Sequence, residues 1–352
     1  MQNRTGFIAF IALSVLCFSC SSTQLMTMSV RQPAPVSIPP YSKTVAIVNR
    51  STVDPKNKAV DITDKIFSLE SASLDKEGAI SSIEGVSDEL LKDNRFQDVK
   101  IATENLTTIN PTVFPAPLSW DVVETICREN HADILFSLEL FDTDSKITYS
   151  ANPVKLNTPL GGIPAIEHQA SMLTQVKCGW RIYDPSSKNI LDEFPVIRHI
   201  SYTGKGINPV AAAGALIGRK EAVKEVGNQS GHAYALRIFP YDIRVSRNYY
   251  VRGTGNFTIA KRRAQTGHWN EAAELWQQET HNPKHKIAGR ACYNMAIISE
   301  INGDLDQALG WAQKSYEDYN NHLALGYVNI LKNRQYNNDI LRDQQSGISA
   351  NK

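Results

Sequence analysis

The sequence of 352 residues is short of several features that would place it in a specialised class. Five cysteines are too few for a disulfide-stapled scaffold, which a chain of this length does not need. The 37 Lys and Arg residues balance 36 Asp and Glu residues, so no bulk charge favours nucleic acid. With 20 glycines and 16 prolines, collagen-like and low-complexity structures are excluded. The remaining composition is that of a globular protein, and the length predicts two or three domains.

The sequence also lacks the short motifs that assign a chemistry. It contains no GxSxG, HExxH, GxGxxG or P-loop pattern. His281 and His285 have the spacing of two metal ligands on a helix, but Pro283 lies between them, so solvated loop histidines are expected. Asp142 and Asp144 begin like a calcium loop without its glycine and glutamate, and a strand-end turn is expected there. We therefore expect no catalytic, metal or cofactor site.

The first nineteen residues predict a signal peptide. Arg4 precedes an apolar run over residues 7–18, which is too short to span a bilayer but suits a signal-peptide core. Residues 16–19 (LCFS) precede Cys20 and small polar residues follow, which resembles the loose lipobox of Bacteroidota lipoproteins. The resemblance implies that Cys20 becomes the lipid-modified first residue of the mature protein. The alternative is a plain secretory peptide, for which Cys17 is small enough at the cleavage site.

Residues 20–42 are predicted to form a lipid-anchored tether. The stretch from Ser21 to Tyr41 contains one charge, Arg31, four prolines and no usable hydrophobic period. Such a composition is typical of an extended, partly polyproline II spacer. At roughly 3 Å per residue, the spacer could hold a folded body several nanometres from a membrane.

Residues 43–252 predict an α/β or α+β domain, a mixed sheet with packed helices. Short apolar runs alternate with amphipathic segments in its first half: strand 44–50, helix 79–91, strand 96–101, a helix capped by Ser119, and strand 132–141. This order predicts a sheet that is at least partly parallel. Val45-Ala46-Ile47 and the segment 132–135 (ADIL) resemble the amino-terminal domain of TolB and of the curli-secretion lipoproteins.

The second half of this domain shows a different pattern. Residues 143–170 are expected to be irregular, and strands 176–183 and 190–202 are expected to form an antiparallel hairpin. A helix stopped by Pro240 leads to a last strand over 241–251. The curli channel needs amphipathic membrane hairpins, whereas the insertions here are polar or interrupted by Gly and Pro. The resemblance therefore implies the fold and not a pore.

Residues 253–335 contain an internal repeat. Three small residues recur at the same spacing 36 residues later: Ala260, Gly267 and Ala272, then Ala296, Gly303 and Ala308. This resembles the tetratricopeptide repeat, in which small residues lie at helix crossings and a glycine at the turn. A third amphipathic stretch over 322–331 would cap the stack, and residues 336–352 form a polar tail. An unrelated all-α bundle is the alternative.

Two further groups of residues have structural explanations. Cys127, Cys178 and Cys292 lie far apart on apolar faces, so buried free thiols are expected, although an oxidising envelope would allow one pair to bridge. The basic and aromatic segment 244–252 has residues that nucleic acid could use, but the compartment and the neutral charge disfavour it. An interdomain seam, with Arg side chains under the first repeat, is expected instead.

The leader, the body, the segment Pro240–Tyr250 and the repeat with Trp269 and Trp276 together resemble one uncharacterised group. It is a family of Bacteroidota cell-envelope lipoproteins with a domain of unknown function, and the resemblance implies no activity. Ser21, rather than an aspartate, follows Cys20, which by resemblance to the proteobacterial sorting rule implies the outer membrane. Because no acidic cluster follows, a periplasm-facing position is expected rather than the cell surface.

The leading hypothesis is a non-enzymatic lipoprotein that acts as a protein-binding or scaffold module and is held to the membrane by its lipid anchor. The repeats would offer a concave surface to a protein or peptide, and no cofactor or nucleic-acid partner is expected. One alternative is an envelope hydrolase whose site is spread over residues 143–170 and 203–218. The other alternative is an oligomeric secretion-associated lipoprotein like the curli channel.

Overall fold

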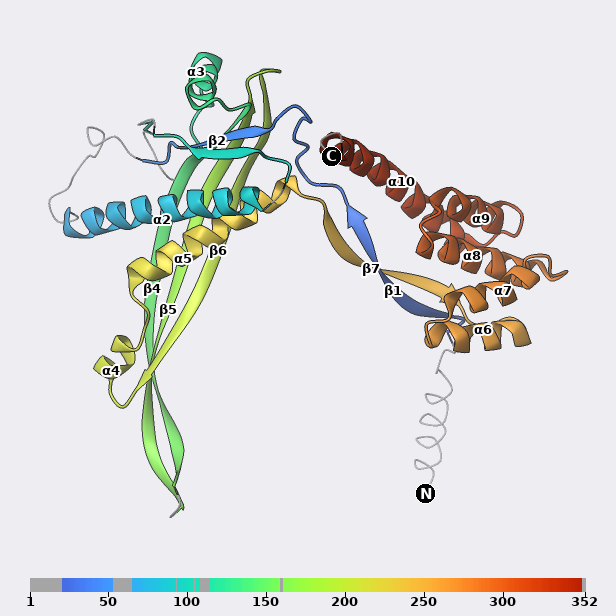
Figure 1. The fold of residues 1–352 in the computed structure, drawn as a ribbon. Coiled ribbons are helices and arrows are strands. Elements are labelled where there is room, and N and C mark those ends of the chain that lie inside the picture. The colour runs from blue at the N-terminus through green and yellow to red at the C-terminus, as the bar shows by residue number, and fades with distance from the viewer. Residues whose placement is uncertain are drawn as a thin grey trace, which may run out of the picture. The chain divides into compact units, whose positions relative to one another are not determined.

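The computed structural model describes residues 21–52, 65–92, 94–103, 106–107, 114–158 and 161–349. The predicted signal peptide and the predicted lipidation site at Cys20 lie outside the described residues. The chain divides into two compact units. The sheet unit comprises Ala34–Pro240 and Asp343–Lys352, and the helical unit comprises Met1–Pro33 and Tyr241–Arg342. The overall class is α+β, which confirms the predicted mixed sheet followed by a run of helices (Figure 1).

The sheet unit contains a five-stranded sheet in the order β3-β2-β4-β5-β6. Its strands are β2 (Thr44–Asn49), β3 (Asp98–Ile101), β4 (Ile134–Thr158), β5 (Gly161–Asp184) and β6 (Asn189–Gly206). β2 runs parallel to both β3 and β4, whereas the pairs β4–β5 and β5–β6 are antiparallel. This pairing confirms the predicted partly parallel sheet and the predicted hairpin.

Helices cover both faces of the parallel part of the sheet. They are α2 (Lys65–Leu91) and α5 (Arg219–Ala235) on one face and α3 (Trp120–Asn130) on the other. The sheet unit also contains α4 (Pro209–Gly214), which packs on β6, and the short 3-10 helix η2 (Leu236–Ile238). In β2, Val45 and Ile47 pack in one core with α2 and α5, whereas Ala46 and Val48 pack in a second core with α3. Successive side chains of a strand point to opposite faces, so β2 is buried from both sides. This burial explains its uninterrupted apolar sequence.

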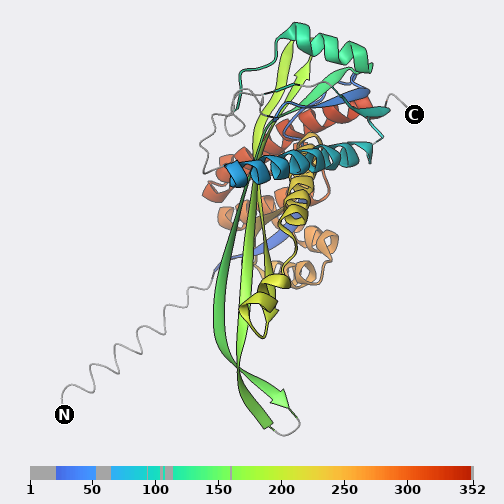
Figure 2. The ribbon, with the colours of Figure 1, turned by 90° about the vertical axis from the view of Figure 1, so that its left-hand side faces the viewer.

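Beyond the helices, β4 and β5 continue as a long hairpin (Figures 1 and 2). The two strands pair as far as Thr158 and Gly161. The prediction that residues 143–170 are irregular is therefore wrong. The strand-end turn predicted at Asp142 and Asp144 is also wrong, because both residues lie inside β4 and pair with β5.

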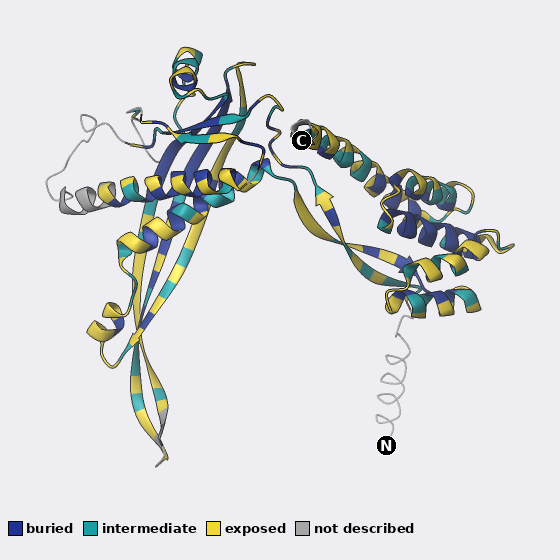
Figure 3. Ribbon diagram, in the orientation of Figure 1, coloured by how far each residue is buried: buried dark blue, intermediate teal, exposed yellow. Residues whose placement is uncertain are grey.

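Two prolines and a lack of deep burial conceal this hairpin in the sequence. Pro153 lies on β4 beyond its pairing with β2, and Pro164 lies on β5 beyond its pairing with β6. A strand with a neighbour on one side only tolerates proline, because the missing N–H can face the unpaired side. Most side chains of the extension are exposed or half-buried, so no continuous apolar run marks the strands (Figure 3).

Glycines bring α2 and α5 close together on one face of the sheet. A Cβ atom added at Gly231 of α5 would lie 1.9 Å from the carbonyl oxygen of Ser82 on α2. One added at Gly85 of α2 would lie 2.2 Å from the carbonyl oxygen of Asn228 on α5. The two helices therefore meet backbone to backbone, at a distance that only a residue without a side chain permits.

The helical unit begins with a two-stranded antiparallel sheet of β1 (Thr23–Gln32) and β7 (Tyr241–Tyr250). The prediction of an extended spacer is wrong, because residues 23–32 form β1, and Val36 and Ile38 beyond it are buried in the core of the sheet unit. Exposed residues alternate with half-buried or buried ones from Gln24 to Gln32, which is the period of a strand with one covered face. The prolines that suggested a spacer begin only at Pro33, after the strand has ended.

Five helices complete the helical unit, and the last of them continues past the end of the unit at Arg342. They are α6 (Gly255–Gln265), α7 (Trp269–Glu279), α8 (His285–Ile301), α9 (Leu305–Glu317) and α10 (His322–Ser349). α8 is buried along most of its length, as expected of a helix packed between neighbours (Figure 3). The predicted polar tail is also helical, since α10 continues to Ser349. Its residues contain no proline, and polar side chains suit a helix that is largely solvated.

Candidate functional site

The six residues of the predicted repeat occupy matching places in two helix pairs, α6–α7 and α8–α9. They are Ala260, Gly267 and Ala272 in the first pair, and Ala296, Gly303 and Ala308 in the second. All four alanines are completely buried, and the two glycines have φ angles of 86° and 82°. The left-handed backbone favours glycine at each turn, and the buried alanines allow each helix to pack closely on its neighbours.

The cysteines and histidines singled out in the sequence form no reactive group. Cys127, Cys178 and Cys292 are free and buried, as predicted. Burial raises the pKa of the first two thiols to about 12 and that of Cys292 to about 11, so all three stay protonated near neutral pH. His281 and His285 are exposed, although His285 begins α8 and is not in a loop. Within the described ranges, no cluster of His, Cys, Asp or Glu could hold a metal ion.

The segments suggested for a hydrolase site, residues 143–170 and 203–218, are largely regular structure. The first belongs to the β4–β5 hairpin, and the second joins the end of β6 to α4. A Cβ atom added at Gly204 would lie 2.3 Å from the carbonyl oxygen of Ala212, so α4 packs directly on the strand. Residues 203–218 therefore form a close packing contact between β6 and α4.

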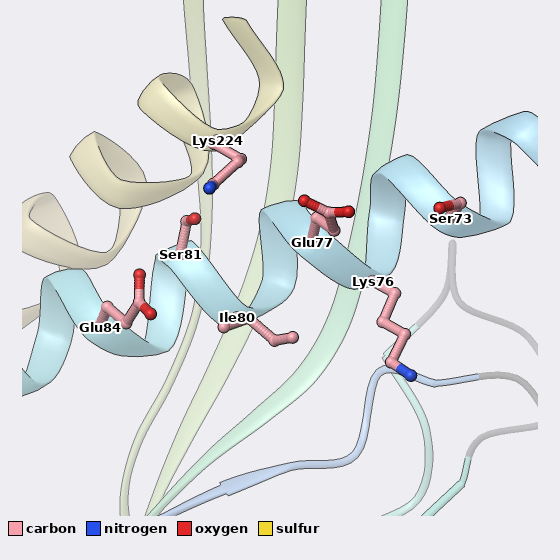
Figure 4. Close-up of a pocket in the computed structure, with 7 residues that line it drawn as sticks. All are labelled: Ser73, Lys76, Glu77, Ile80, Ser81, Glu84 and Lys224. Atoms are coloured by element: carbon pink, nitrogen blue, oxygen red, sulfur yellow. The ribbon is translucent and has the colours of Figure 1, made fainter. Parts of the chain in front are cut away.

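A groove of about 430 Å³ lies on the outer side of α2 and α5 (Figure 4). Its walls are formed by Ser73, Lys76, Glu77, Ile80, Ser81, Glu84 and Lys224. Lys224 extends from α5 toward Ser81 and Glu84, whereas Lys76 points away from them. Glu77 is paired with Lys220 at 2.6 Å. Two acids and two lysines balance the charge, and the serines have no histidine beside them in this lining, so the groove offers no activated nucleophile.

A buried ionic cluster lies in the sheet, next to the carboxyl end of β2. Glu139 of β4 is completely buried, accepts a hydrogen bond of 2.8 Å from Arg50 and another of 2.7 Å from the hydroxyl of Tyr183. Burial and the Glu139 carboxylate raise the pKa of Tyr183 to about 12. Open sheets often bind ligands at this edge. Here Arg50 Nη1 also donates to the carbonyl oxygen of Ala116, so the charge of Arg50 is paired with Glu139 and one of its nitrogens is bonded within the protein.

A second buried cluster connects β7, α8 and α10 in the helical unit. Glu300 of α8 accepts two hydrogen bonds of 2.8 Å from Arg247 of β7, and others from Tyr327 and Arg334 of α10. Burial alone would raise the pKa of Glu300, but the hydrogen bonds from its partners hold it below the ordinary value. Arg247 therefore contacts the second helix pair and does not lie under the first repeat. The neighbouring Tyr249 contacts the first pair, with its ring against Trp269 and Trp276.

The helical unit also carries a pocket of about 430 Å³, which we name the cationic pocket. Its lining consists of Ser22, Tyr250, Lys286, Gly289, Arg290, Tyr319, Asn320, Asn321, His322 and Leu323. α8 supplies Lys286 and Arg290, one helical turn apart, and the turn between α9 and α10 supplies the opposite wall. The lining includes Lys286, Arg290 and His322 but no acidic residue.

The walls of the cationic pocket are fixed by hydrogen bonds. The hydroxyl of Tyr250 donates to the side chain of Asn321 at 2.9 Å, and the Asn321 amide donates to Ser315 Oγ at 3.0 Å. Ser315 Oγ in turn donates to the carbonyl oxygen of Gly289 at 2.7 Å, which connects the turn to α8. These contacts hold the pocket in one shape before any ligand arrives.

Sequence reasoning missed both buried clusters and the cationic pocket. A signal existed for the clusters: Glu139 and Glu300 are charged residues inside apolar stretches, where an unpaired carboxylate would be costly. No comparable signal existed for the pocket. Its residues come from four separate parts of the chain, each of which has an ordinary surface composition.

The fold and these sites define a two-unit α+β protein with a mixed sheet, helix pairs and a preformed cationic pocket. The chain belongs to the family described as a domain of unknown function, DUF8603, which matches residues 42–250. A second domain of unknown function, DUF6340, matches residues 258–333. No curated protein matches the sequence. Within the described ranges, no helix has the length and apolar character needed to cross a membrane.

Solved structures show only distant similarity to this chain. A neuraminyllactose-binding hemagglutinin homologue from Helicobacter pylori is 12% identical, with a TM-score of 0.18, over 58% of this chain and 84% of its own. The PelC dodecamer from Paraburkholderia phytofirmans is 10% identical, with a TM-score of 0.19, over 59% of this chain and 96% of its own.

Proposed function

We propose that the protein is a non-enzymatic lipoprotein of the cell envelope that binds other proteins or serves as a scaffold for them. The observation that carries the proposal is the helical unit, in which two helix pairs share the same glycine turn and the same buried alanines. Helix pairs of this kind resemble tetratricopeptide repeats, whose stacked surfaces bind polypeptides. The cationic pocket gives this surface a preformed recess that a partner could enter.

The proposal includes an anchor at Cys20. Its support is the lipobox-like sequence before Cys20, which resembles that of Bacteroidota lipoproteins, and the sequence after it favours the periplasmic side of the outer membrane. One acyl chain anchors a protein only marginally, whereas two or more hold it stably. In Cys20→Ser we expect no incorporation of a fatty-acid analogue and no partition with detergent-phase lipoproteins. Wild-type protein that takes up no analogue would rule out the anchor, and removal by protease shaving of intact cells would rule out the periplasmic position.

Site-specific photo-crosslinking in cells tests the binding function. Leu323 lines the cationic pocket and Ile80 lines the groove of Figure 4, and their exposed fractions are similar, 48% and 44%. A photoreactive residue at position 323 should give a discrete protein adduct, identified by mass spectrometry. The same residue at position 80 is the matched control and should give none. If position 323 and other exposed positions of the helical unit yield no adduct, the binding function is wrong.

One observation favours a second candidate, an oligomeric envelope lipoprotein. In the long hairpin, Ile147 pairs with Met172 and Tyr149 pairs with Ala170, so one face is apolar, whereas the residues between them are largely polar. Their partners Met172 and Ala170 are buried, but Ile147 and Tyr149 themselves are 60% and 49% exposed. Exposed apolar side chains that lie together on a strand can pack against another subunit. Mass photometry of the detergent-purified chain should then show a discrete oligomer that Ile147→Lys dissociates. A monomer at all concentrations would rule out this candidate.

A further inference from the structure

The cationic pocket carries the positive charges of Lys286 and Arg290, and no acid in its lining neutralises them. Lys286, Arg290 and His322 line it, and in the described part of the chain none of the three forms an ion pair. This differs from Arg247 and Arg334 of the same unit, which are both paired with Glu300. Uncompensated basic side chains around a recess create a positive potential that favours an anionic ligand.

Arg290 is held in position, and among the described residues only one of its nitrogens forms a hydrogen bond. Its Nη1 donates to the carbonyl oxygen of Arg252 at 2.8 Å, and its guanidinium carbon lies 5.0 Å from the centre of the Tyr250 ring. A guanidinium has five N–H donors, so the remaining ones are available for a planar oxyanion such as a carboxylate. The side chain is thus oriented before binding, which reduces the entropy cost of recognising a ligand.

The opposite wall adds a favourable dipole. α10 begins at His322, has 28 residues and carries no acidic residue in its first turn. The amino end of a long helix bears a partial positive charge that stabilises an anion nearby. This contribution acts together with the three basic side chains, which lie on two different helices and converge on one recess.

The size and the other lining residues distinguish a polypeptide from a small ion. A recess of about 430 Å³ is far larger than a single oxyanion, and Tyr250, Tyr319 and Leu323 add apolar surface to its walls. Pockets that combine apolar walls with a few fixed polar groups suit a side chain or a chain end. We infer that the cationic pocket binds a carboxylate carried by a polypeptide, in an acidic segment of a protein partner. This inference rests on the proposed protein-binding function and assigns its recognition site.

Binding of a defined probe tests the inference with the full chain in detergent. A fluorescein-labelled peptide of ten glutamates is titrated by anisotropy at low salt, beside the same peptide with ten glutamines. The glutamate peptide should bind at least tenfold more tightly than the glutamine peptide. Lys286→Glu should weaken its binding at least tenfold, because a reversed charge in the recess repels the ligand. Lys332→Glu makes the same charge change on α10 outside the pocket and should change the affinity less than twofold.

Three results would overturn the inference. The first is a Lys286→Glu affinity within twofold of wild type, and the second is equal binding of the two peptides. The third is binding of phosphatidylglycerol vesicles that depends on Lys286 while the peptide does not bind, which would assign the pocket to a lipid phosphate. The crosslinking experiment separates this inference from the proposed function. An adduct at position 323 that persists in Lys286→Glu would leave the binding function intact and remove the pocket as its recognition site.

Discussion

Replacing Gly231 with alanine should destabilise the sheet unit, although alanine is the better helix former. Alanine gains up to about 1 kcal/mol over glycine inside a helix. The added Cβ atom, however, would lie 1.9 Å from the carbonyl oxygen of Ser82 and 2.9 Å from the amide nitrogen of Val86. Both atoms belong to the backbone of α2, so no side chain can rotate away. The two helices would have to separate by roughly 1 Å in a closely packed core.

The expected loss follows from two opposing effects. Overpacking by one methyl group typically costs about 1–3 kcal/mol, and the rigid backbone of α2 places Gly231 at the upper end of that range. Separating the helices also loosens Val86 and Val226, which are completely buried in the same core. After subtraction of the gain in helix propensity, we expect the free energy of unfolding to fall by about 1–2 kcal/mol.

Urea unfolding followed by tryptophan fluorescence measures this change. Trp180 reports on the site, because its ring stacks on Tyr234 of α5 with centroids 5.3 Å apart. Gly310→Ala is the matched control, since nothing lies within 4 Å of the Cβ atom it would add to α9. The control should stabilise its own unit by up to about 1 kcal/mol. If Gly231→Ala stabilises the protein as the control does, the close approach of α2 and α5 is wrong.

Three further substitutions test other parts of the structure. Glu300→Gln leaves two arginines without their carboxylate and should lower the unfolding free energy of the helical unit by about 3 kcal/mol, measured by urea unfolding. Ala272→Leu should cost about 1–3 kcal/mol in the same assay, whereas Glu274→Gln on the solvated face should stay within about 0.5 kcal/mol. Burial raises the pKa of Asp75 to about 6, so the folded state binds this proton more readily than the unfolded state, and stability falls as the pH rises from about 4 to 6. Asp75→Asn should abolish this part of the pH dependence of the urea midpoint; an unchanged dependence would refute the assignment.

The elements that the sequence predicted correctly are those buried on a regular period. β2 is apolar and buried from Val45 to Val48 because helices cover both of its faces, and α3 places Val123, Ile126 and Cys127 on one buried side. The hairpin of β5 and β6 was recognisable from alternation around a polar turn. In each case one or both faces of the element are buried, so apolar residues recur in the sequence with the period of a strand or a helix.

The elements that the sequence predicted wrongly are those whose partners lie far along the chain. β1 pairs with β7, so that Thr23 lies opposite Tyr250, more than 200 residues away. The alternation of Met26, Met28 and Val30 with polar residues is typical of a strand, but it does not identify the partner strand. The four prolines after the strand are typical of a spacer, and they led to the wrong prediction for residues 20–42. The outer part of the β4–β5 hairpin has little buried surface, so strand pairing there relies on backbone hydrogen bonds, which residues of many kinds can form.

The candidate site depends on a distinction that the sequence alone does not make, that between paired and unpaired charge. Arg247 and Glu300 are separated by 53 residues, and Arg50 and Glu139 by 89, yet both pairs are buried and neutralise each other. Such pairs give the sequence an ordinary balance of charge, and each arginine already has its acidic partner inside the protein. Once the paired side chains are set aside, the basic groups of the cationic pocket stand out, because they share a recess that contains no acid. The functional signal is therefore the charge that folding leaves unmatched, and reversing Lys286 changes that charge without disturbing a buried pair.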